Sequence, residues 1–185
     1  MRIFIALDIP DEIRSRIAEY MERARQHAPE ARWARVEGLH VTLKFVGEVN
    51  ESRLQEIKSA LSAIKAASFD VAFENAGFFP TSRSPRVFWI GVQAGGALPQ
   101  LAAHIDQSLR MGVTREEREY NPHLTLARGG APGSLKGLVP LLELEGPPRF
   151  GTMAVREFFL FQSLLGKGGA KYTKLEKFVL DDPVQ

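Results

Sequence analysis

The sequence predicts a domain of mixed helices and strands that is built from two similar halves. A short motif occurs twice, as HVTL at 40–43 and as HLTL at 123–126, and each copy stands among segments that follow a β-α-β order. A given histidine is followed by threonine at +2 and leucine at +3 on the order of once in two hundred times. Because the chain has only four histidines, the second copy indicates a shared role for the two segments.

The first half is expected to alternate strands and helices. Pro10 and Asp11 open the first helix, and Asn50 is expected to cap the second, because its side chain can accept a hydrogen bond from a free N–H at the helix start. Between these signals, apolar residues recur with the period of a strand or of a helix. The expected elements are strand Arg2–Asp8, helix 11–26, strand 40–46 and helix 51–66.

The second half repeats this order after a pair of strands. The turn-rich segment FPTSRSPR at 79–86 joins those two strands, and a loop rich in glycine and proline follows the second motif. The expected elements are strands 69–77 and 87–93, helix 97–110, strand His123–Arg128, a short helix 134–143, and strands 150–161 and 172–180.

Length and composition are those of a globular protein. The 185 residues are 44% hydrophobic and 25% charged, enough for one domain with a sizeable core. The absence of cysteine excludes disulfides and thiolate zinc sites and fits a reducing compartment such as the cytoplasm. The start, MRIFIALDIP, resembles a first strand and not a signal peptide. No apolar run approaches the roughly 18 residues of a membrane-spanning helix.

Strand geometry gives each motif a polar and an apolar face. Side chains at i and i+2 point to the same side of a strand. His40 and Thr42 are therefore expected to project together, as are His123 and Thr125, with each pair roughly 6 to 7 Å apart. The opposite face is expected to be core, and it carries Val41, Leu43, Phe45, Leu124 and Leu126.

Two imidazoles from separate strands suit the cleavage of a phosphodiester. One can remove a proton from the attacking water or hydroxyl while the other protonates the departing alkoxide, and an ordinary pKa near 6.5 serves both roles at neutral pH. The threonine hydroxyls can donate to non-bridging phosphate oxygens. Such a scheme requires no metal.

Simpler explanations stay open for these residues and their neighbours. The histidines could be structural, and Thr42 and Thr125 could be present as β-formers. Arg128 could bind phosphate bidentately, although its parity places it on the core face unless the strand ends or twists first. Lys44 shares the predicted face of His40, where it is either a site residue or a solvated lysine at the strand end.

At these residues the chain resembles the two-histidine (2H) phosphoesterase superfamily, which is defined by paired H-x-T-x motifs. More narrowly, it resembles the LigT-like RNA 2′,3′-cyclic phosphodiesterases, also called 2′-5′ RNA ligases. The resemblance runs nearly end to end and includes RIFIALDIP, LHVTLKFVGEV, VFWIGV, NPHLTLAR and SLLGKGGAKYTKLEKF. These flanking segments are more specific than either motif alone.

The resemblance implies a bilobal α+β fold of duplicated β-α-β units, with two antiparallel sheets forming a central cleft within a single domain, 1–185. It implies an enzyme that opens a terminal 2′,3′-cyclic phosphate of RNA to a 2′-phosphomonoester without a cofactor. By this analogy His40 protonates the departing 3′-oxygen and His123 activates water. The expected phosphate ligands are Thr42, Thr125 and Arg128. The expected partner is an RNA with a cyclic phosphate end, including tRNA fragments, and we expect a monomer.

Residues outside the motifs are weaker candidates. Lys167 and Lys171 in GKGGAK, which lacks the spacing of a P-loop, are expected to lie in a loop where they contact RNA backbone. His27 and His104 are expected to be ordinary surface or packing residues. Five aromatic residues could stack an RNA base, namely Trp33, Phe78, Phe79, Tyr120 and Tyr172.

Other function classes make different predictions. A non-catalytic RNA-end binder would not turn over a cyclic phosphate, and a metal-dependent hydrolase would be inhibited by EDTA and would cluster His with Asp or Glu, which neither motif shows. An ATP-consuming ligase would need a nucleotide-binding or adenylated-lysine motif, which we do not find. Within the superfamily, the alternative substrate is a small nucleotide, such as ADP-ribose 1″,2″-cyclic phosphate or a 2′-5′ oligoadenylate.

Overall fold

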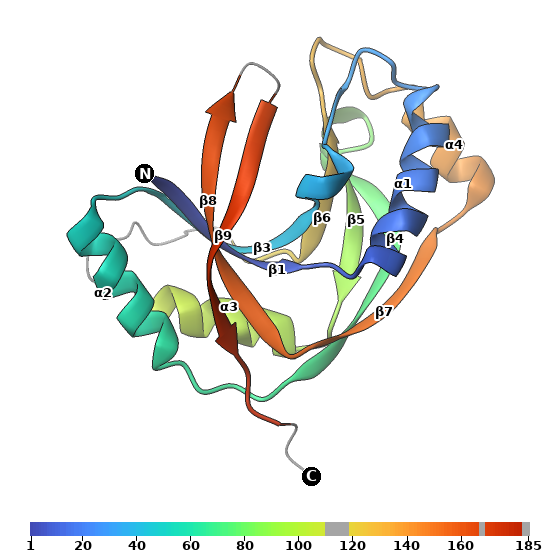
Figure 1. Ribbon diagram of the computed structural model, residues 1–185. Coiled ribbons are helices and arrows are strands. Elements are labelled where there is room, and N and C mark those ends of the chain that lie inside the picture. The colour runs from blue at the N-terminus through green and yellow to red at the C-terminus, as the bar shows by residue number, and fades with distance from the viewer. Residues whose placement is uncertain (110–118, 167–168, 183–185) are drawn as a thin grey trace.

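The computed structural model describes residues 1–109, 119–166 and 169–182, which form an α+β structure with two antiparallel sheets (Figure 1). The strands are β1 (Arg2–Asp8), β2 (Arg32–Trp33), β3 (His40–Glu48), β4 (Phe69–Thr81), β5 (Ser84–Gln93), β6 (His123–Arg128), β7 (Arg149–Val155), β8 (Glu157–Gly166) and β9 (Gly169–Val179). The helices are α1 (Asp11–Arg25), α2 (Glu51–Ser62), α3 (Ala97–Ser108) and α4 (Leu138–Glu145), with a 3₁₀ turn η1 (Val36–Gly38). The first sheet has the strand order β3-β1-β8-β9, and the second has the order β2-β6-β5-β4-β7.

The predicted duplication is confirmed. In β1-α1-β3 and again in β5-α3-β6, a helix connects two strands that pair as antiparallel neighbours. The two histidine strands, β3 and β6, therefore hold equivalent places in the two sheets. Neither sheet is parallel, so the repeated unit is not the right-handed crossover of α/β folds.

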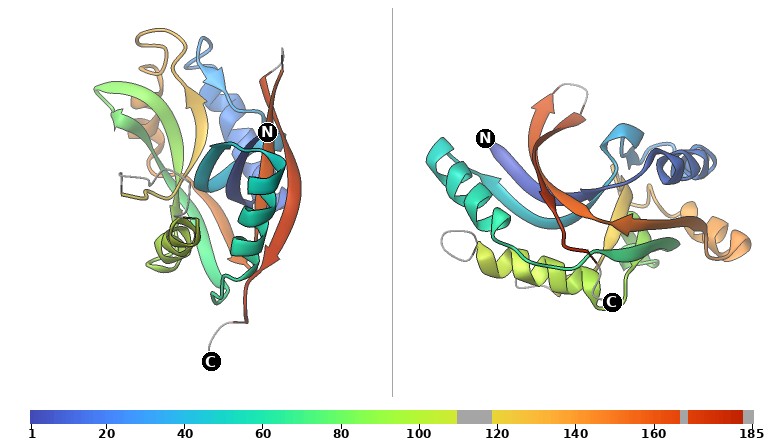
Figure 2. Two further views of the ribbon diagram at one scale, coloured as in Figure 1. Left: turned by 90° about the vertical axis from the view of Figure 1, so that its left-hand side faces the viewer. Right: turned by 60° about the horizontal axis from the view of Figure 1, so that its bottom comes forward.

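The two halves interlock through their helices. Tyr20 of α1 contacts Phe88 and Phe150 of the second sheet, whereas α3 packs against β3 of the first sheet. Figures 1 and 2 show α1 and α4 together at one end of the molecule and α2 and α3 at the opposite end. One continuous hydrophobic core contains side chains from both sheets and from α1 to α4.

Helix signals in the sequence act as expected at α1 and α2. The buried residues of α1 recur every three or four positions and are Ile13, Ile17, Tyr20, Met21 and Ala24. At the start of α2, the side chain of Asn50 accepts a hydrogen bond from the backbone N–H of Arg53 at 2.8 Å. The predicted cap is therefore confirmed. No helix in the described ranges is long and apolar enough to span a membrane.

The single strand predicted at 150–161 is wrong, because this segment forms two strands in different sheets. Strand β7 ends at Val155 in the second sheet, and β8 begins at Glu157 in the first. Val155 and Phe158 are both buried, and one unbroken strand would place side chains three positions apart on opposite faces. The break at Arg156 therefore passes the chain from one sheet to the other.

The short helix predicted at 134–143 begins later, at Leu138. Pro140 lacks a backbone N–H, so it fits only the first turn of a helix, where N–H groups have no partner inside the helix.

Strands β8 and β9 form a hairpin that extends into the segment where a loop was expected, with Gly166 paired to Gly169. Lys167 lies outside the described residues, and Lys171 is an exposed residue of β9.

Candidate active site

The two motif histidines are held in the same way. His40 begins β3 and His123 begins β6, and each Nδ1 lies 2.7 Å from the carbonyl oxygen two residues earlier, of Gly38 and of Asn121. Because a carbonyl only accepts, Nδ1 carries the proton in both rings and Nε2 is the free nitrogen. A neutral ring can therefore accept a proton at Nε2, and a charged ring can donate one from it.

A hydrogen bond joins the two motifs. The strands β3 and β6 lie close together although they belong to different sheets. Tyr120, three residues before His123, donates its hydroxyl to the backbone carbonyl of Thr42 at 2.9 Å. Burial raises the pKa of Tyr120, so its hydroxyl keeps its proton through the neutral range. The bond fixes the start of the second motif to the backbone of the first.

Burial lowers the pKa of both histidines from the ordinary value of 6.5, and it is the largest influence on each. The hydrogen bond at Nδ1 opposes this effect in both rings. The neighbouring charges differ. Asp8 raises the pKa of His40 and outweighs Arg14, which lowers it, whereas Arg128 lowers the pKa of His123. The charged side chains therefore favour a proton on His40 and a neutral His123.

A charged network holds the segment that leads into His40. Asp8 is the register partner of His40 on β1, and its carboxylate binds Arg14 at 2.7 Å and Lys174 at 2.5 Å. Arg14 also donates a hydrogen bond to the carbonyl of Val36 at 2.7 Å, and this bond connects η1 to α1. The sequence alone does not reveal this network, because its members come from four separate segments and no spacing relates them.

A β-bulge in each histidine strand changes which residues share the histidine face. In the pairing of β3 with β1, Leu43 has no partner residue. In the pairing of β6 with β5, Leu126 has none. Thr42 and Thr125 precede the bulges, and each is a half-buried residue that alternates with buried neighbours, as its histidine does. Strand parity therefore holds from each histidine to its threonine and changes after the next residue.

The bulge in β3 makes two predictions wrong. Lys44, expected on the histidine face, is only 4% exposed, and its ammonium lies 2.6 Å from the carboxylate of Asp106 in α3. Phe45, expected in the core, is 58% exposed. It pairs in register with Phe4, whose ring contacts His40 at 4.7 Å. Because Leu43 is an extra residue in β3, Lys44 lies on the buried side of the strand and Phe45 on the exposed side.

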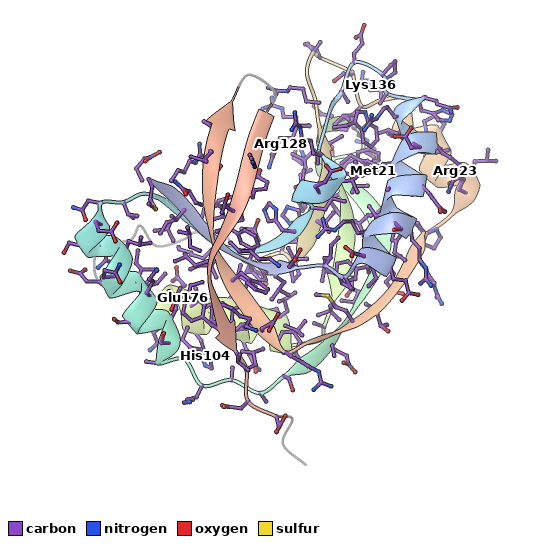
Figure 3. All side chains as sticks on the ribbon, in the orientation of Figure 1. Met21, Arg23, His104, Arg128, Lys136 and Glu176 are labelled. Carbon is purple, nitrogen blue, oxygen red and sulfur yellow. The ribbon has the colours of Figure 1, made fainter. Side chains whose placement is uncertain are left out.

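The bulge in β6 places Arg128 where Phe45 stands in β3. Leu126 and Ala127 are both buried, and Arg128 is exposed at the end of the strand (Figure 3). Its charge lowers the pKa of His123. Parity would direct Arg128 into the core unless the strand ended or twisted first, and it is instead the bulge at Leu126 that makes this expectation wrong.

Aromatic rings flank both histidines. Tyr172 of β9 makes an edge-on ring contact with His40 at 5.0 Å, and Phe79 of β4 makes the same contact with His123 at 4.9 Å.

Two further candidates for base stacking take part in the packing of the protein instead. Trp33 donates its indole N–H to the carbonyl of Ala28 at 2.9 Å. Phe78 is buried in the core.

The remaining histidines lie apart from this arrangement. His27 and His104 are exposed, and Figure 3 shows His104 on α3, far down the molecule from Arg128. Across the described ranges, no three side chains of the His, Asp or Glu type gather into a metal-binding cluster.

Comparison with known proteins places the chain in a family. The model for LigT-like phosphoesterases matches it twice, at residues 7–89 and 90–172, once for each histidine motif. It is similar to the RNA 2′,3′-cyclic phosphodiesterase of Archaeoglobus fulgidus, with 34% identity over 96% of this chain and 99% of the relative. It is also similar to that of Escherichia coli K12, with 33% identity over 97% and 96%.

Solved structures agree with these relatives. The crystal structure of E. coli LigT complexed with 3′-AMP has a TM-score of 0.80 to this chain, with 31% identity over 97% of both chains. A further crystal structure of a phosphoesterase has a TM-score of 0.81, with 32% identity over 98% of both chains. The two motif matches, the full-length similarity and the shared architecture lead to one conclusion. The chain belongs to the LigT-like phosphoesterase family.

Proposed function

We propose that the protein hydrolyses the 2′,3′-cyclic phosphate end of RNA to a 2′-phosphomonoester, with His40 and His123 as a metal-independent acid–base pair. One observation carries the proposal. Two histidines on neighbouring strands have the same hydrogen bond at Nδ1 and the same free Nε2, and Tyr120 links their motifs. The names of the relatives in A. fulgidus and E. coli support the same substrate class.

The reaction needs one proton removed and one supplied. His123 Nε2 takes a proton from water while the water oxygen forms a bond to phosphorus. The bond from phosphorus to the 3′-oxygen breaks, its electron pair stays on that oxygen, and His40 Nε2–H protonates it. The product is a 2′-phosphomonoester with a free 3′-hydroxyl. Proton exchange with solvent returns both histidines to their starting states.

The neighbouring charges support this assignment of roles. Asp8 favours a charged His40, which the acid must be, and Arg128 favours a neutral His123, which the base must be. The alternative assignment would place the base beside a carboxylate and the acid beside a guanidinium, against both influences. The motif symmetry alone leaves the roles undecided, and the neighbouring charges support His40 as the acid and His123 as the base.

Charge builds on the phosphate oxygens as the ester opens. The hydroxyls of Thr42 and Thr125 and the guanidinium of Arg128 are the groups that we assign to these oxygens. Each threonine lies two residues after its histidine, and Arg128 is exposed at the end of the strand that His123 begins, where its charge lowers the pKa of His123. If the 5′-hydroxyl of an RNA takes the place of water, it loses its proton to His123, its oxygen bonds to phosphorus and the 3′-oxygen leaves with a proton from His40, which gives a 2′-5′ linkage without ATP.

The experiment is an incubation with an RNA that ends in a 2′,3′-cyclic phosphate, such as a tRNA fragment, in the presence of EDTA. We expect a 2′-monophosphate end and no 3′-monophosphate, and we expect the protein to act as a monomer. His40→Ala and His123→Ala should each lose most activity, and His104→Ala, an exposed histidine on α3, is the matched control.

Three results would oppose the proposal. Binding of the RNA end without turnover would favour a non-catalytic binder. Loss of activity in EDTA would favour a metal-dependent hydrolase. Faster turnover of ADP-ribose 1″,2″-cyclic phosphate or a 2′-5′ oligoadenylate than of RNA would favour a small-nucleotide phosphodiesterase.

A further inference from the structure

The two motifs differ in the residue that links each histidine to the carbonyl that orients it. Residues 38–40 read Gly-Leu-His, whereas residues 121–123 read Asn-Pro-His, and the first residue of each triplet supplies the carbonyl. The ring of Pro122 fixes its φ near about −65°, which restricts the path of the backbone into the second histidine. Leu39 has no such restriction, so other contacts must hold the carbonyl of Gly38 in place.

Arg14 supplies contacts on both sides of that carbonyl. Its guanidinium donates to the carbonyls of Val36 at 2.7 Å and of Leu39 at 3.3 Å. The carbonyl of Gly38 lies between these two in the chain and accepts the proton of His40 Nδ1. Figure 1 shows this turn, η1, between α1 and the β8–β9 hairpin. The side chain of Arg14 is only 15% exposed, so water competes weakly for its hydrogen bonds.

The guanidinium of Arg14 is itself held in a fixed position. It donates to Asp8 Oδ1 at 2.7 Å and to the carbonyl of Ile9 at 3.2 Å, and Lys174 binds the other oxygen of the same carboxylate. Four acceptors on two segments surround one planar group. A lysine ammonium has no planar fork and could not satisfy this set in the same geometry.

Tyr172 confines the same turn. A methyl group added at Gly38 would lie 3.2 Å from two carbons of the Tyr172 ring, so this ring packs directly against the backbone there. The ring also contacts His40 at 5.0 Å. The orienting carbonyl therefore belongs to a segment that is bonded to Arg14 and packed against Tyr172.

We infer that Arg14, held by Asp8, is a positioning residue for the proposed acid, because it fixes the carbonyl of Gly38 that directs the ring of His40. In the second motif the rigid link at Pro122 serves the same purpose for the base. The inference rests on the proposed function for the role of His40 as the acid. The contact itself is independent of that role.

The contact is tested by nitrogen NMR of the imidazole rings, at a pH where both are neutral. In the unmodified protein, His40 and His123 should each carry the proton on Nδ1. Arg14→Gln should convert His40 to a mixture of Nδ1–H and Nε2–H forms and leave His123 unchanged. Arg16→Gln is the matched control, because this arginine of α1 also donates to a backbone carbonyl, that of Phe150 at 3.0 Å. It should change neither ring.

The link to the acid is tested with two RNAs that end in a cyclic phosphate. One has the natural 3′-oxygen, and the other has a bridging sulfur in its place. A thiolate leaves without a proton, because a thiol is a far stronger acid than an alcohol, so the sulfur RNA does not need the acid. Arg14→Gln should lower kcat for the natural RNA by about 5- to 100-fold, with KM nearly unchanged. It should lower kcat for the sulfur RNA much less, whereas His123→Ala should slow both.

A purely structural role for Arg14 would give a different result. Equal losses of kcat on the two RNAs, or a His40 ring that stays in the Nδ1–H form in Arg14→Gln, would overturn the inference. If Arg14→Gln does not fold, Arg14→Lys is measured instead, with the same selective loss expected at a smaller size. A His40 ring that depends on Arg14 in a protein that turns over neither RNA would reject the proposed function and leave the positioning contact in place.

Discussion

At the scale of residues, the two histidines differ in the charges beside them and not in how their rings are held. Both donate Nδ1–H to a carbonyl at 2.7 Å, and burial lowers the pKa of both. Asp8 stands beside one ring and Arg128 beside the other. The two copies of the motif therefore meet opposite charges, from neighbours that the motif does not contain.

Arg128→Gln should change the pH dependence of kcat/KM as well as its size. The base must be neutral, so the ascending limb of the profile follows the pKa of His123. Arg128 lowers that pKa, so its removal should raise the pKa and move the ascending limb to higher pH. Arg128→Lys keeps the charge, and it should leave the limb in place while kcat/KM falls from loss of the bidentate contact.

Arg32→Gln is the control for this experiment, because Arg32 is the register partner of Arg128 on β2 and is also exposed. Its profile should match that of the unmodified protein. An ascending limb that stays fixed in Arg128→Gln would show that the guanidinium does not act on the base.

At the scale of elements, the residue skipped directly after each threonine, Leu43 in β3 and Leu126 in β6, decides which side chains share the face of the histidine. Parity predicts the face of Thr42 and Thr125 correctly and fails immediately after them, at Lys44 and Phe45. Neither bulge contains glycine or proline, and a partner strand is needed to define the register. The partner of Lys44, Asp106, belongs to a helix of the other half. Local sequence cannot contain this information.

Lys44→Ala should destabilise the protein without removing a catalytic group. It removes the ammonium that lies 2.6 Å from the carboxylate of Asp106, and a hydrogen bond to a charged group is worth about 1.5 to 3 kcal/mol. We expect a loss of that size in the free energy of unfolding, measured by urea denaturation. Lys58→Ala removes a more exposed pair with Glu176 (Figure 3) and should cost less than about 1 kcal/mol.

The same pair of variants distinguishes a structural from a catalytic role for Lys44. At temperatures well below unfolding, Lys44→Ala should keep a near-normal kcat. Normal stability combined with lost turnover would place Lys44 on the histidine face, contrary to the register of β3.

Tyr120→Phe tests whether the link between the motifs positions the histidines. The variant keeps the ring and removes the hydroxyl that donates to Thr42 at 2.9 Å. Loss of one hydrogen bond is worth about 0.5 to 1.5 kcal/mol, and we expect kcat to fall by up to about tenfold with little change in KM. Tyr20→Phe, at a buried tyrosine of α1, is the matched control and should leave kcat unchanged. Equal kcat values in the two variants would show that the link has no role in positioning.

At the scale of the whole molecule, the order of elements could be predicted from sequence and their assignment to sheets could not. Periodicity located the histidine strands and α1 to α3, because each has one apolar face. It missed the change of sheet at Arg156, since the apolar run continues on both sides and no turn residue marks the break. The contact of α1 with the second sheet depends on pairing between distant segments, which periodicity does not encode.

Helix α1 packs against the sheet of the second half, and α3 packs against β3 of the first half. This interlocking explains how two motifs far apart in sequence can lie close together. Strand β3 is covered by α3 from the other half, and Tyr120 of the second half bonds to Thr42 of the first. The relative position of the histidines therefore depends on the whole core, and a site of this kind requires both halves.

The central claim is that His40 and His123 act as one unit. The most direct test is the rate at which a cyclic phosphate RNA is opened under single-turnover conditions by His40→Ala, His123→Ala and the double variant. Each single change should slow the reaction by about 10² to 10⁴, and the double variant should be little slower than the worse single variant. Near-normal turnover in either single variant, or losses that multiply in the double variant, would contradict the claim.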